Sequence, residues 1–437
     1  MAAVSSDRSL RGGAGWRRAL MWGLGVALAH RLVLTLWMAL VWLLFGAQTG
    51  HAVDSHNTPI AALPALSSPL EELAFGVWRR WDVVEYLNLA QNGYRATDPH
   101  ASVYGPLAPL VIRLLDVALP GPLDLAGMVF GTAAFALALV MLYRVVEVAY
   151  GDPDLAPYAV VATALLPLSY FLTAPMSDAI YLALVLGMFY AASQERWWLM
   201  GVCGFLATLA RTQGVLLTVV AGVLALEMPL LPSREWRTRL VKALRRTWPL
   251  ALIPLGYAAF TAYRRSVGLP PLVQTYHQAS YHFFVNPLEG LIINLRWLVR
   301  YPLHSLTNVD FLAMLLVPPL TALLGRYPLH RRLSAIVYCV ASYLVFISKI
   351  NWRFGTQEVL YSISVARYAL TLFPLTVLLA DLYRRLGQGR NGWHRSTKRT
   401  SGGRRIGPRF LRLLMVGMAF GGLLIFSAAH ALGAGPN

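Results

Sequence analysis

Residues 19–46 read ALMWGLGVALAHRLVLTLWMALVWLLFG, an apolar run that carries His30 and Arg31 near its middle. A helix needs about 20 predominantly apolar residues to cross the hydrocarbon core of a bilayer. The run is too long for the core of a signal peptide, so we expect a retained membrane helix that also directs insertion. Comparable runs recur along the chain. They are continuous rather than alternating, which favours membrane helices over a membrane β-barrel.

The composition supports the same class of protein. Of the 437 residues, 57% are hydrophobic and only 13% are charged, whereas about 25% of the residues of a soluble domain are charged. We therefore predict an all-α, polytopic transmembrane protein with eleven spans. The expected spans cover residues 19–46, 122–149, 155–173, 177–193, 197–211, 213–231, 248–265, 310–325, 332–348, 367–384 and 409–430.

The distribution of basic residues predicts the orientation of the chain. Residues 1–18 carry four arginines, and we expect this segment to stay in the cytoplasm. With eleven spans, the inner segments hold about twice as many Lys and Arg residues as the outer segments, in agreement with the positive-inside rule. The net charge of +18 is then largely a topology signal and a contact with anionic lipid, and nucleic acid is not expected as a partner.

The predicted organisation is one transmembrane catalytic unit with short appendages. This unit covers residues 19–384 and includes a long outer loop, 47–121, which is expected to carry interfacial helices. Residues 385–408 are rich in Arg, Lys, Gly and Ser and are predicted to form a disordered cytoplasmic loop. Residues 409–437 supply the last helix and the C-terminal segment.

The outer loop contains residues 75–94, FGVWRRWDVVEYLNLAQNGY, which are too polar to span a bilayer. As one helix, this stretch places its acids among aromatic and apolar side chains on one face. That face would carry Trp78, Asp82, Glu85, Tyr86 and Leu89. Carboxylates beside membrane are costly without a partner or a function. The alternative is an interfacial amphipathic helix whose acids face water. Residues 103–115, which contain two prolines, are too short to span and are expected along the interface.

The predicted topology brings further charged groups to the same outer side. Asp178 follows the turn 174–177, and Lys349, Arg353 and Arg367 flank a later outer loop. The planar fork of arginine suits a phosphate or pyrophosphate. Structural roles are the alternatives: an ion pair or snorkelling for the two arginines, and an N-cap together with Ser177 for Asp178. The sequence thus indicates an outer, lipid-accessible site with an acid and several phosphate partners.

These stretches together resemble a known family, the PIG-V type mannosyltransferases. That family is related to GPI mannosyltransferase II and belongs to the GT-C class of membrane glycosyltransferases. The matching stretches are 80–94, 104–114, 166–178, 189–199, 209–214 and 367–374. The sequence departs from the family pattern at three positions. Glu85 stands where an aromatic residue is more usual, Asp178 replaces the commoner Glu, and Ala366 replaces a Pro.

The resemblance implies an inverting glycosyltransferase of GT-C type that moves a sugar, typically mannose, from a polyprenyl- or dolichyl-phosphate donor to a lipid- or protein-linked glycan. Asp82 is the expected general base. The residues expected to bind the donor phosphate are Arg80, Lys349, Arg353 and Arg367, and those expected to support Asp82 are Trp81, Glu85, Tyr86 and Asp178. No cofactor is required, although Asp82 and Asp178 leave room for a divalent cation.

Other function classes remain open at this point. The same cations and aromatic residues could serve a transporter or flippase of a lipid-linked sugar, but the chain lacks two repeated halves. A catalytically silent scaffold is a third alternative. The expected location is an integral membrane, the plasma membrane in a bacterium or the endoplasmic reticulum in a eukaryote, with the site on the outer or lumenal face.

Overall fold

The computed structural model describes residues 13–46, 63–64, 66–95, 101–227, 241, 244–279, 282–327, 329–330, 332–351, 359–387 and 408–432. The basic loop 385–408 lies largely outside these residues, as does most of the segment 1–18. The described elements are α2 (Gly13–Phe45), α3 (Pro69–Ala74), η3 (Gly76–Trp78), α4 (Asp82–Asn92), η4 (Ala101–Val103), α5 (Leu107–Ala118), α6 (Leu123–Val148), α7 (Ala156–Leu165), α8 (Tyr170–Thr173), α9 (Ser177–Ser193), α10 (Trp197–Ala210), η5 (Thr212–Leu216), α11 (Leu217–Glu227), η6 (Trp248–Ala251), α13 (Leu252–Ser266), α14 (Leu272–Ala279), β1 (His282–Phe284), α15 (Pro287–Arg300), α16 (Pro302–Thr307), α17 (Val309–Arg326), α18 (Leu333–Ser348), β2 (Lys349–Asn351), α19 (Val365–Ala369), α20 (Phe373–Gly387) and α21 (Pro408–Ala431).

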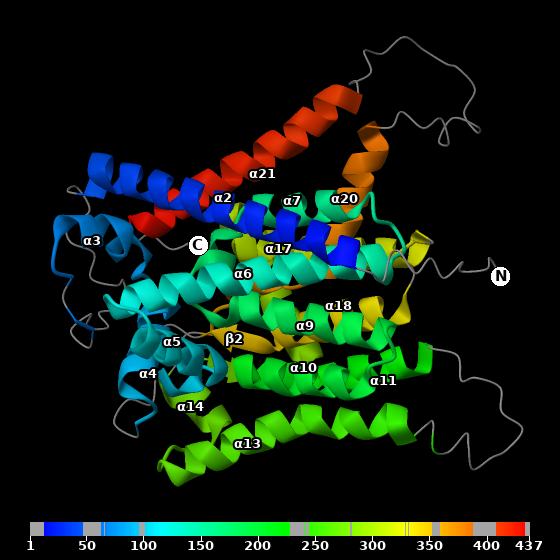
Figure 1. Ribbon diagram of the computed structural model, residues 1–437, viewed down its shortest axis with the longest axis horizontal. Coiled ribbons are helices and arrows are strands. Elements are labelled where there is room, and N and C mark those ends of the chain that lie inside the picture. Colours follow the sequence, from blue (N-terminus) through cyan, green and yellow to red (C-terminus); the bar gives the residue numbers. More distant parts are fainter. Residues whose placement is uncertain are drawn as a thin grey trace, which may run out of the picture.

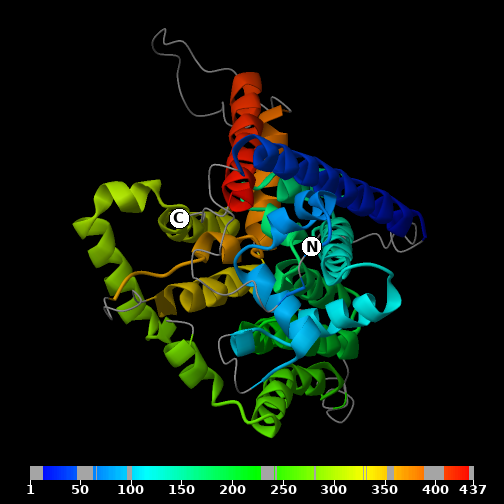
Figure 2. The ribbon, with the colours of Figure 1, turned by 90° about the vertical axis from the view of Figure 1, so that its left-hand side faces the viewer.

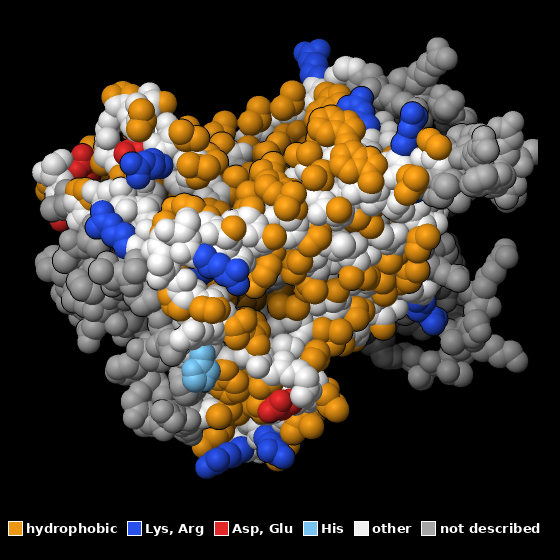
Figure 3. Space-filling model, turned by 90° about the horizontal axis from the view of Figure 1, so that it is seen from below, with side chains coloured by type: hydrophobic (Ala, Val, Ile, Leu, Met, Phe, Trp, Pro, Cys, Tyr) orange, Lys and Arg blue, Asp and Glu red, His pale blue; other side chains and the backbone are white. Residues whose placement is uncertain are grey.

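The chain is a helical membrane protein, as predicted. Within the described residues, four helices are long and apolar enough to cross a bilayer: Gly13–Phe45, Leu123–Val148, Val309–Arg326 and Leu411–Ala431. Five further apolar helices are shorter. The predicted spans 122–149, 177–193 and 332–348 coincide with α6, α9 and α18 to within a residue at each end. The number of eleven spans stays a prediction. Figure 3 shows a broad field of hydrophobic side chains with Lys and Arg mostly toward its margins.

The helices form a bundle around α6, which packs against α2, α5, α7 and α9. Helices α2 and α21 cross on one side of this bundle (Figure 1), where Trp37 Nε1 donates to the carbonyl oxygen of Leu424 at 2.9 Å. The segment from α13 to α17 curves around another side (Figure 2). Helices α4 and α5 lie together at one end of the bundle (Figure 1).

Residues 75–94 do not form one helix, so the prediction for this stretch was wrong in its first part. Trp78 ends the 3-10 turn η3, and α4 begins at Asp82. Between them Trp81 has φ 52° and ψ −137°, a conformation that side-chain-bearing residues rarely adopt. Arg79 in this turn forms a buried ion pair with Asp124 at the start of α6, in which Arg79 Nε donates to Asp124 Oδ1 at 2.7 Å. This ion pair holds the turn against α6. The break places Asp82 at the first residue of α4.

The predicted span 155–173 is also divided, into α7 and α8. Leu166 leaves the helical region with φ −58° and ψ 139°, because a residue that precedes proline is pushed out of the α conformation. Pro167 follows it directly. The short helix α8 then leads through Ala174 and Met176 to α9.

Gly131 on α6 permits the close approach of the turn that precedes α9. A Cβ at this position would lie 2.7 Å from the carbonyl oxygen of Ala174 and would also meet that of Thr173. We expect Gly131→Ala to lower the free energy of unfolding by about 1–3 kcal/mol, since two backbone segments would have to separate. Thermal unfolding in detergent measures this effect.

The matched control for this change is Gly421→Ala on α21, where nothing lies within 4 Å of the added Cβ. Alanine is the better helix former by about 1 kcal/mol, so this variant should be at least as stable as the native protein. An equal loss of stability in both variants would contradict the packing explanation for Gly131.

Candidate active site

Asp82 and Glu85 both lie on α4, but in different environments. The side chain of Asp82 is 30% exposed, whereas Glu85 is only 6% exposed. An interfacial helix whose acids both face water is therefore wrong for this chain. Tyr86, one turn after Asp82, is buried, and its hydroxyl lies 2.6 Å from Ser177 Oγ. Helix α4 thus presents one half-buried carboxylate at its N-terminal end.

Asp178 is fully buried at the start of α9. Met176 is the N-cap residue, and no side chain caps the helix, so the capping role that was considered for Asp178 is wrong. Its carboxylate instead accepts hydrogen bonds from two arginines. Arg211 Nη2 donates at 2.6 Å and Arg367 Nη2 at 2.7 Å. Two guanidinium groups therefore compensate one buried carboxylate, which is the condition under which such a charge is tolerated.

The short helix α19 is held at its N-terminal end by the carboxylate of Asp310. Ser364 is in the left-handed conformation with φ 65°, and the amides of Ser364 and Ala366 donate to the carboxylate of Asp310 at 2.7 and 2.8 Å. A carboxylate is favourable at the N-terminus of a helix because the free amides there carry partial positive charge. This contact fixes the direction in which Arg367 leaves α19.

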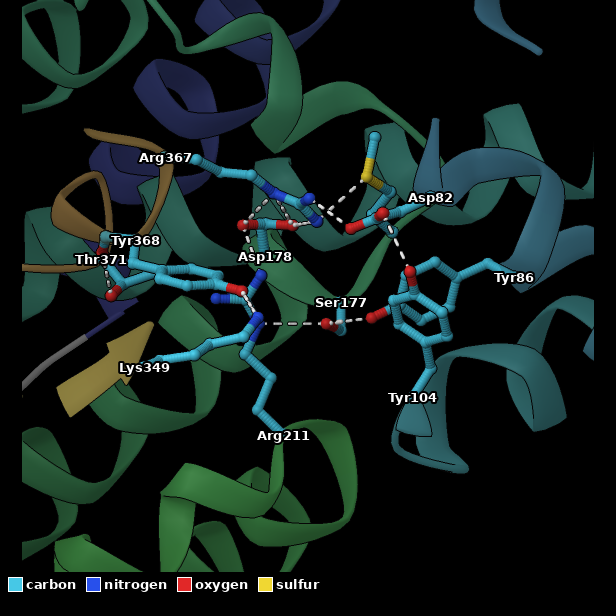
Figure 4. A network of polar contacts seen from close by, with 11 residues as sticks. Asp82, Tyr86, Tyr104, Ser177, Asp178, Arg211, Lys349, Arg367, Tyr368 and Thr371 are labelled. Carbon is cyan, nitrogen blue, oxygen red and sulfur yellow. Dashed lines mark hydrogen bonds and ion pairs between the residues drawn. The ribbon is translucent and has the colours of Figure 1, made fainter. Parts of the chain in front are cut away.

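Arg367 joins the two acidic residues into one network (Figure 4). Its Nη1 donates to Asp82 Oδ2, while Nε and Nη2 donate to Asp178. Tyr104, which precedes α5, donates its hydroxyl proton to the other oxygen of Asp82, Oδ1, at 2.9 Å. Both oxygens of Asp82 thus have a partner, and segments separated by 285 positions in the sequence meet at this carboxylate.

Lys349 reaches the network from the strand β2. This strand pairs antiparallel with β1, and Lys349 lies opposite Phe284. Lys349 Nζ donates to the hydroxyl of Tyr368 at 3.2 Å and lies 5.5 Å from the ring centroids of Tyr276 and Tyr368. The aromatic rings stabilise the ammonium group by cation–π attraction.

The electrostatics of the site favour charged forms. Burial raises the pKa of Asp82, but the charge of Arg367 and the hydrogen bonds from Arg367 and Tyr104 outweigh it and lower the pKa to about 2. Burial lowers the pKa of Lys349, but its two tyrosine neighbours and Asp82 raise it above its usual value overall. Arg211 and Arg367 pair with the two carboxylates, and Lys349 joins them through the ring of Tyr368, against which both Lys349 and Arg211 lie. Three cations thus accompany two carboxylates in this group of side chains. The excess of one cation favours an anionic ligand.

Five of the nine residues singled out in the sequence meet in this network: Asp82, Tyr86, Asp178, Lys349 and Arg367. Arg80 is buried and donates to the carbonyl oxygens of Gly76, Arg79 and Ala431. Trp81 provides the turn before α4, and Glu85 is buried on that helix. Arg353 lies outside the described residues. The roles predicted for all nine residues stay predictions.

The structure adds Tyr104, Ser177, Arg211 and Tyr368 to the site. Arg211 was recognised only as part of the matching stretch 209–214. A buried-charge argument could have selected it, because an arginine at the end of the apolar run 197–211 needs a partner. Ser177 was considered only as a cap. Periodicity carries no signal for tyrosine hydroxyls that act through tertiary contacts.

A divalent cation does not fit between the two carboxylates in this arrangement. The guanidinium group of Arg367 lies between Asp82 and Asp178 and donates to both. The described residues contain no cluster of three or more His, Cys, Asp or Glu side chains that could hold a metal ion. Mg²⁺ and Ca²⁺ bind through oxygen ligands such as carboxylates, and here the oxygens of Asp82 and Asp178 that face one another are occupied by Arg367.

The fold and the site together define a helical membrane protein with a buried carboxylate–guanidinium network at one end of its bundle. Residues 25–228 match the model of the family described as Mannosyltransferase (PIG-V). The matched residues include Asp82, Asp178 and Arg211, and the match agrees with the sequence resemblance to the PIG-V type mannosyltransferases.

One curated relative is GPI alpha-1,6-mannosyltransferase 2 from Cricetulus griseus. It is 29% identical over 172 residues, which cover 38% of this chain and 35% of the relative. The match thus spans about a third of the length of that relative.

Solved structures of the oligosaccharyltransferase from Archaeoglobus fulgidus are also similar. The structure tethered to an acceptor peptide is 11% identical with a TM-score of 0.44, and the match covers 95% of this chain and 56% of that one. The archaeal oligosaccharyltransferase in complex with an inhibitory peptide and a dolichol-phosphate is 12% identical with a TM-score of 0.42, covering 94% and 56%.

Proposed function

We propose that the protein is an inverting glycosyltransferase that moves a sugar, most simply mannose, from a polyprenyl- or dolichyl-phosphate donor to a glycan acceptor. The match of residues 25–228 to a mannosyltransferase family model supports glycosyl transfer as the class of reaction. The observation that carries the proposal is the partly exposed carboxylate of Asp82 beside a group of side chains that holds one more cation than carboxylates. Sugar transfer from a lipid phosphate needs a base for the acceptor hydroxyl and cations for the departing phosphate, and both kinds of group are present here. The site faces the non-cytoplasmic side, according to the charge distribution of the sequence.

Asp82 acts as the general base of the reaction. The acceptor hydroxyl gives its proton to the carboxylate of Asp82 while its oxygen forms a bond to the anomeric carbon of the sugar. The bond from that carbon to the phosphate oxygen breaks, and its electron pair leaves with the lipid phosphate. Attack and departure occur on opposite faces of the sugar, so the anomeric configuration inverts. The phosphate needs no proton to leave, so one carboxylate suffices.

The cations stabilise the departing phosphate. Lys349 provides an ammonium group whose hydrogen-bond partner is a tyrosine hydroxyl and not a carboxylate, and Arg367 provides the guanidinium group next to Asp82. Preorganised cations of this kind act where negative charge develops in the transition state. Asp178, which also pairs with Arg211, holds Arg367 and thereby keeps its charge in place.

The proposal is tested with the purified full chain in liposomes and a labelled polyprenyl-phosphate-mannose. Release of polyprenyl phosphate that depends on an added glycan acceptor, with a product of opposite anomeric configuration, is the expected result. Passage of intact donor across the bilayer without release would instead identify a transporter and would overturn the proposal.

Lys349→Met should weaken donor binding more than it slows the chemical step. The variant keeps most of the length of the side chain but removes the one positive charge that no carboxylate in this group of side chains balances. Truncating a charged partner of a buried contact costs about 2 kcal/mol or more, so we expect KM for the donor to rise at least about tenfold with a smaller change in kcat. Lys349→Arg, which keeps the charge, is the control. Unchanged KM in Lys349→Met would remove Lys349 from the donor site.

A further inference from the structure

The guanidinium group of Arg367 is shared unequally between its two carboxylates. Two of its nitrogens, Nε and Nη2, donate to Asp178, with Nε 3.2 Å and Nη2 2.7 Å from Oδ2. Only Nη1 donates to Asp82. Arg367 is therefore anchored on Asp178 by a two-point contact, and Nη1 is the nitrogen that faces the half-exposed acid (Figure 4).

The two contacts also differ in how easily they are exchanged. Asp178 is fully buried, and its pair with Arg367 cannot be broken without leaving a charge unpaired in the interior. The side chain of Asp82 is 30% exposed, so water can solvate its carboxylate when Arg367 takes another partner, and no fully buried charge is left unpaired. An anion that reaches this edge can replace Asp82 at Nη1 while the anchor on Asp178 stays intact.

We propose that the lipid phosphate of the donor takes Nη1 of Arg367 from Asp82, so that Asp82 becomes an effective base only while a donor is bound. This inference rests on the proposed function and adds to it how the site is regulated. Lys349 supplies the second cation for the incoming phosphate, since it lies against the ring of Tyr368 together with Arg211 and is an electrostatic neighbour of Asp82. Tyr104 keeps its hydrogen bond to Asp82 and holds the carboxylate toward the acceptor.

The physical reason is that the carboxylate of Asp82 and the lipid phosphate compete for one hydrogen-bonding group, Nη1 of Arg367. While Arg367 holds Asp82, the positive charge keeps the pKa of Asp82 at about 2, which makes the carboxylate a weak base. Transfer of Nη1 to a phosphate removes a hydrogen bond from Asp82 and adds a nearby negative charge, and both changes raise the pKa. The charged and titratable groups that face Asp82 are Tyr104, Asp178, Lys349, Arg367 and Tyr368.

A double-mutant cycle with polyprenyl phosphate as the probe tests the competition. In the native background, Asp82→Asn should tighten binding of polyprenyl phosphate by about tenfold, because Nη1 loses its charged partner and keeps at most a weaker bond to a neutral amide. In the Arg367→Gln background the same change should alter binding by less than about twofold. Arg211 still compensates Asp178 in that background, and thermal unfolding shows whether both variants fold.

The possible results separate the two proposals. Equal tightening in both backgrounds would mean simple charge repulsion and would overturn the switch, while the proposed reaction would stand. Failure of the native protein to bind polyprenyl phosphate at all would remove the donor class, and the switch with it. If Arg367→Gln does not fold, the pH dependence of the native enzyme decides. The acid limb of kcat must then lie at higher pH than that of kcat/KM, and coinciding limbs overturn the switch.

Discussion

Replacing Asp82 by asparagine is expected to lower the rate of sugar transfer by at least about 10²–10⁴-fold, the contribution that a general base typically makes. The amide has nearly the same shape as the carboxylate and cannot accept the proton of the acceptor hydroxyl. Arg367 loses one partner but keeps its contacts with Asp178, so the fold should persist. Release of polyprenyl phosphate and thermal unfolding, measured on the same preparation, check both parts.

The matched control for this prediction is Asp116→Asn on α5, which makes the same chemical change outside the network of Figure 4. This variant should keep its activity. Full turnover by Asp82→Asn would remove Asp82 from the mechanism. Since the pKa of Asp82 is lowered to about 2 in the free protein, its charge is present above that pH. Protonation of Asp82 should therefore not reduce kcat/KM until the pH falls toward about 2.

Asp178→Asn is expected to destabilise the protein by about 3–5 kcal/mol, because removal of one partner leaves buried charges uncompensated. Asp178 is fully buried and pairs with both Arg211 and Arg367. Its loss leaves Arg211 without the carboxylate that balances it and leaves Arg367 with Asp82 alone. The free energy of unfolding in a detergent–denaturant titration measures the effect.

Asp178→Glu serves as the conservative control for this change, since it keeps the charge and lengthens the side chain by one methylene group. It should recover most of the stability lost in Asp178→Asn. A small loss of stability in Asp178→Asn, with sugar transfer intact, would contradict the role assigned to the ion-pair network. A large loss in both variants would indicate that the packing around α9 is the cause.

The sequence alone was sufficient to predict the class of protein and the ends of several helices. The predicted spans 122–149, 177–193 and 332–348 agree with α6, α9 and α18 because each is a continuous apolar run whose ends are marked by Pro, Gly or polar residues. The cost of charge near a membrane singled out Asp82 and Arg367, and the predicted topology placed Asp178 and Lys349 on the same outer side. Length and charge are properties of one segment and can be read without knowing its neighbours.

Only the tertiary structure decided which of these groups pair. The break before α4 depends on the positive φ of Trp81 and on the buried contact between Arg79 and Asp124, neither of which follows from helical periodicity. Arg367 lies 285 positions from Asp82 and 189 from Asp178. A hydrogen bond is short and directional. Which group Arg367 binds therefore depends on distances that only the packing of these distant segments creates.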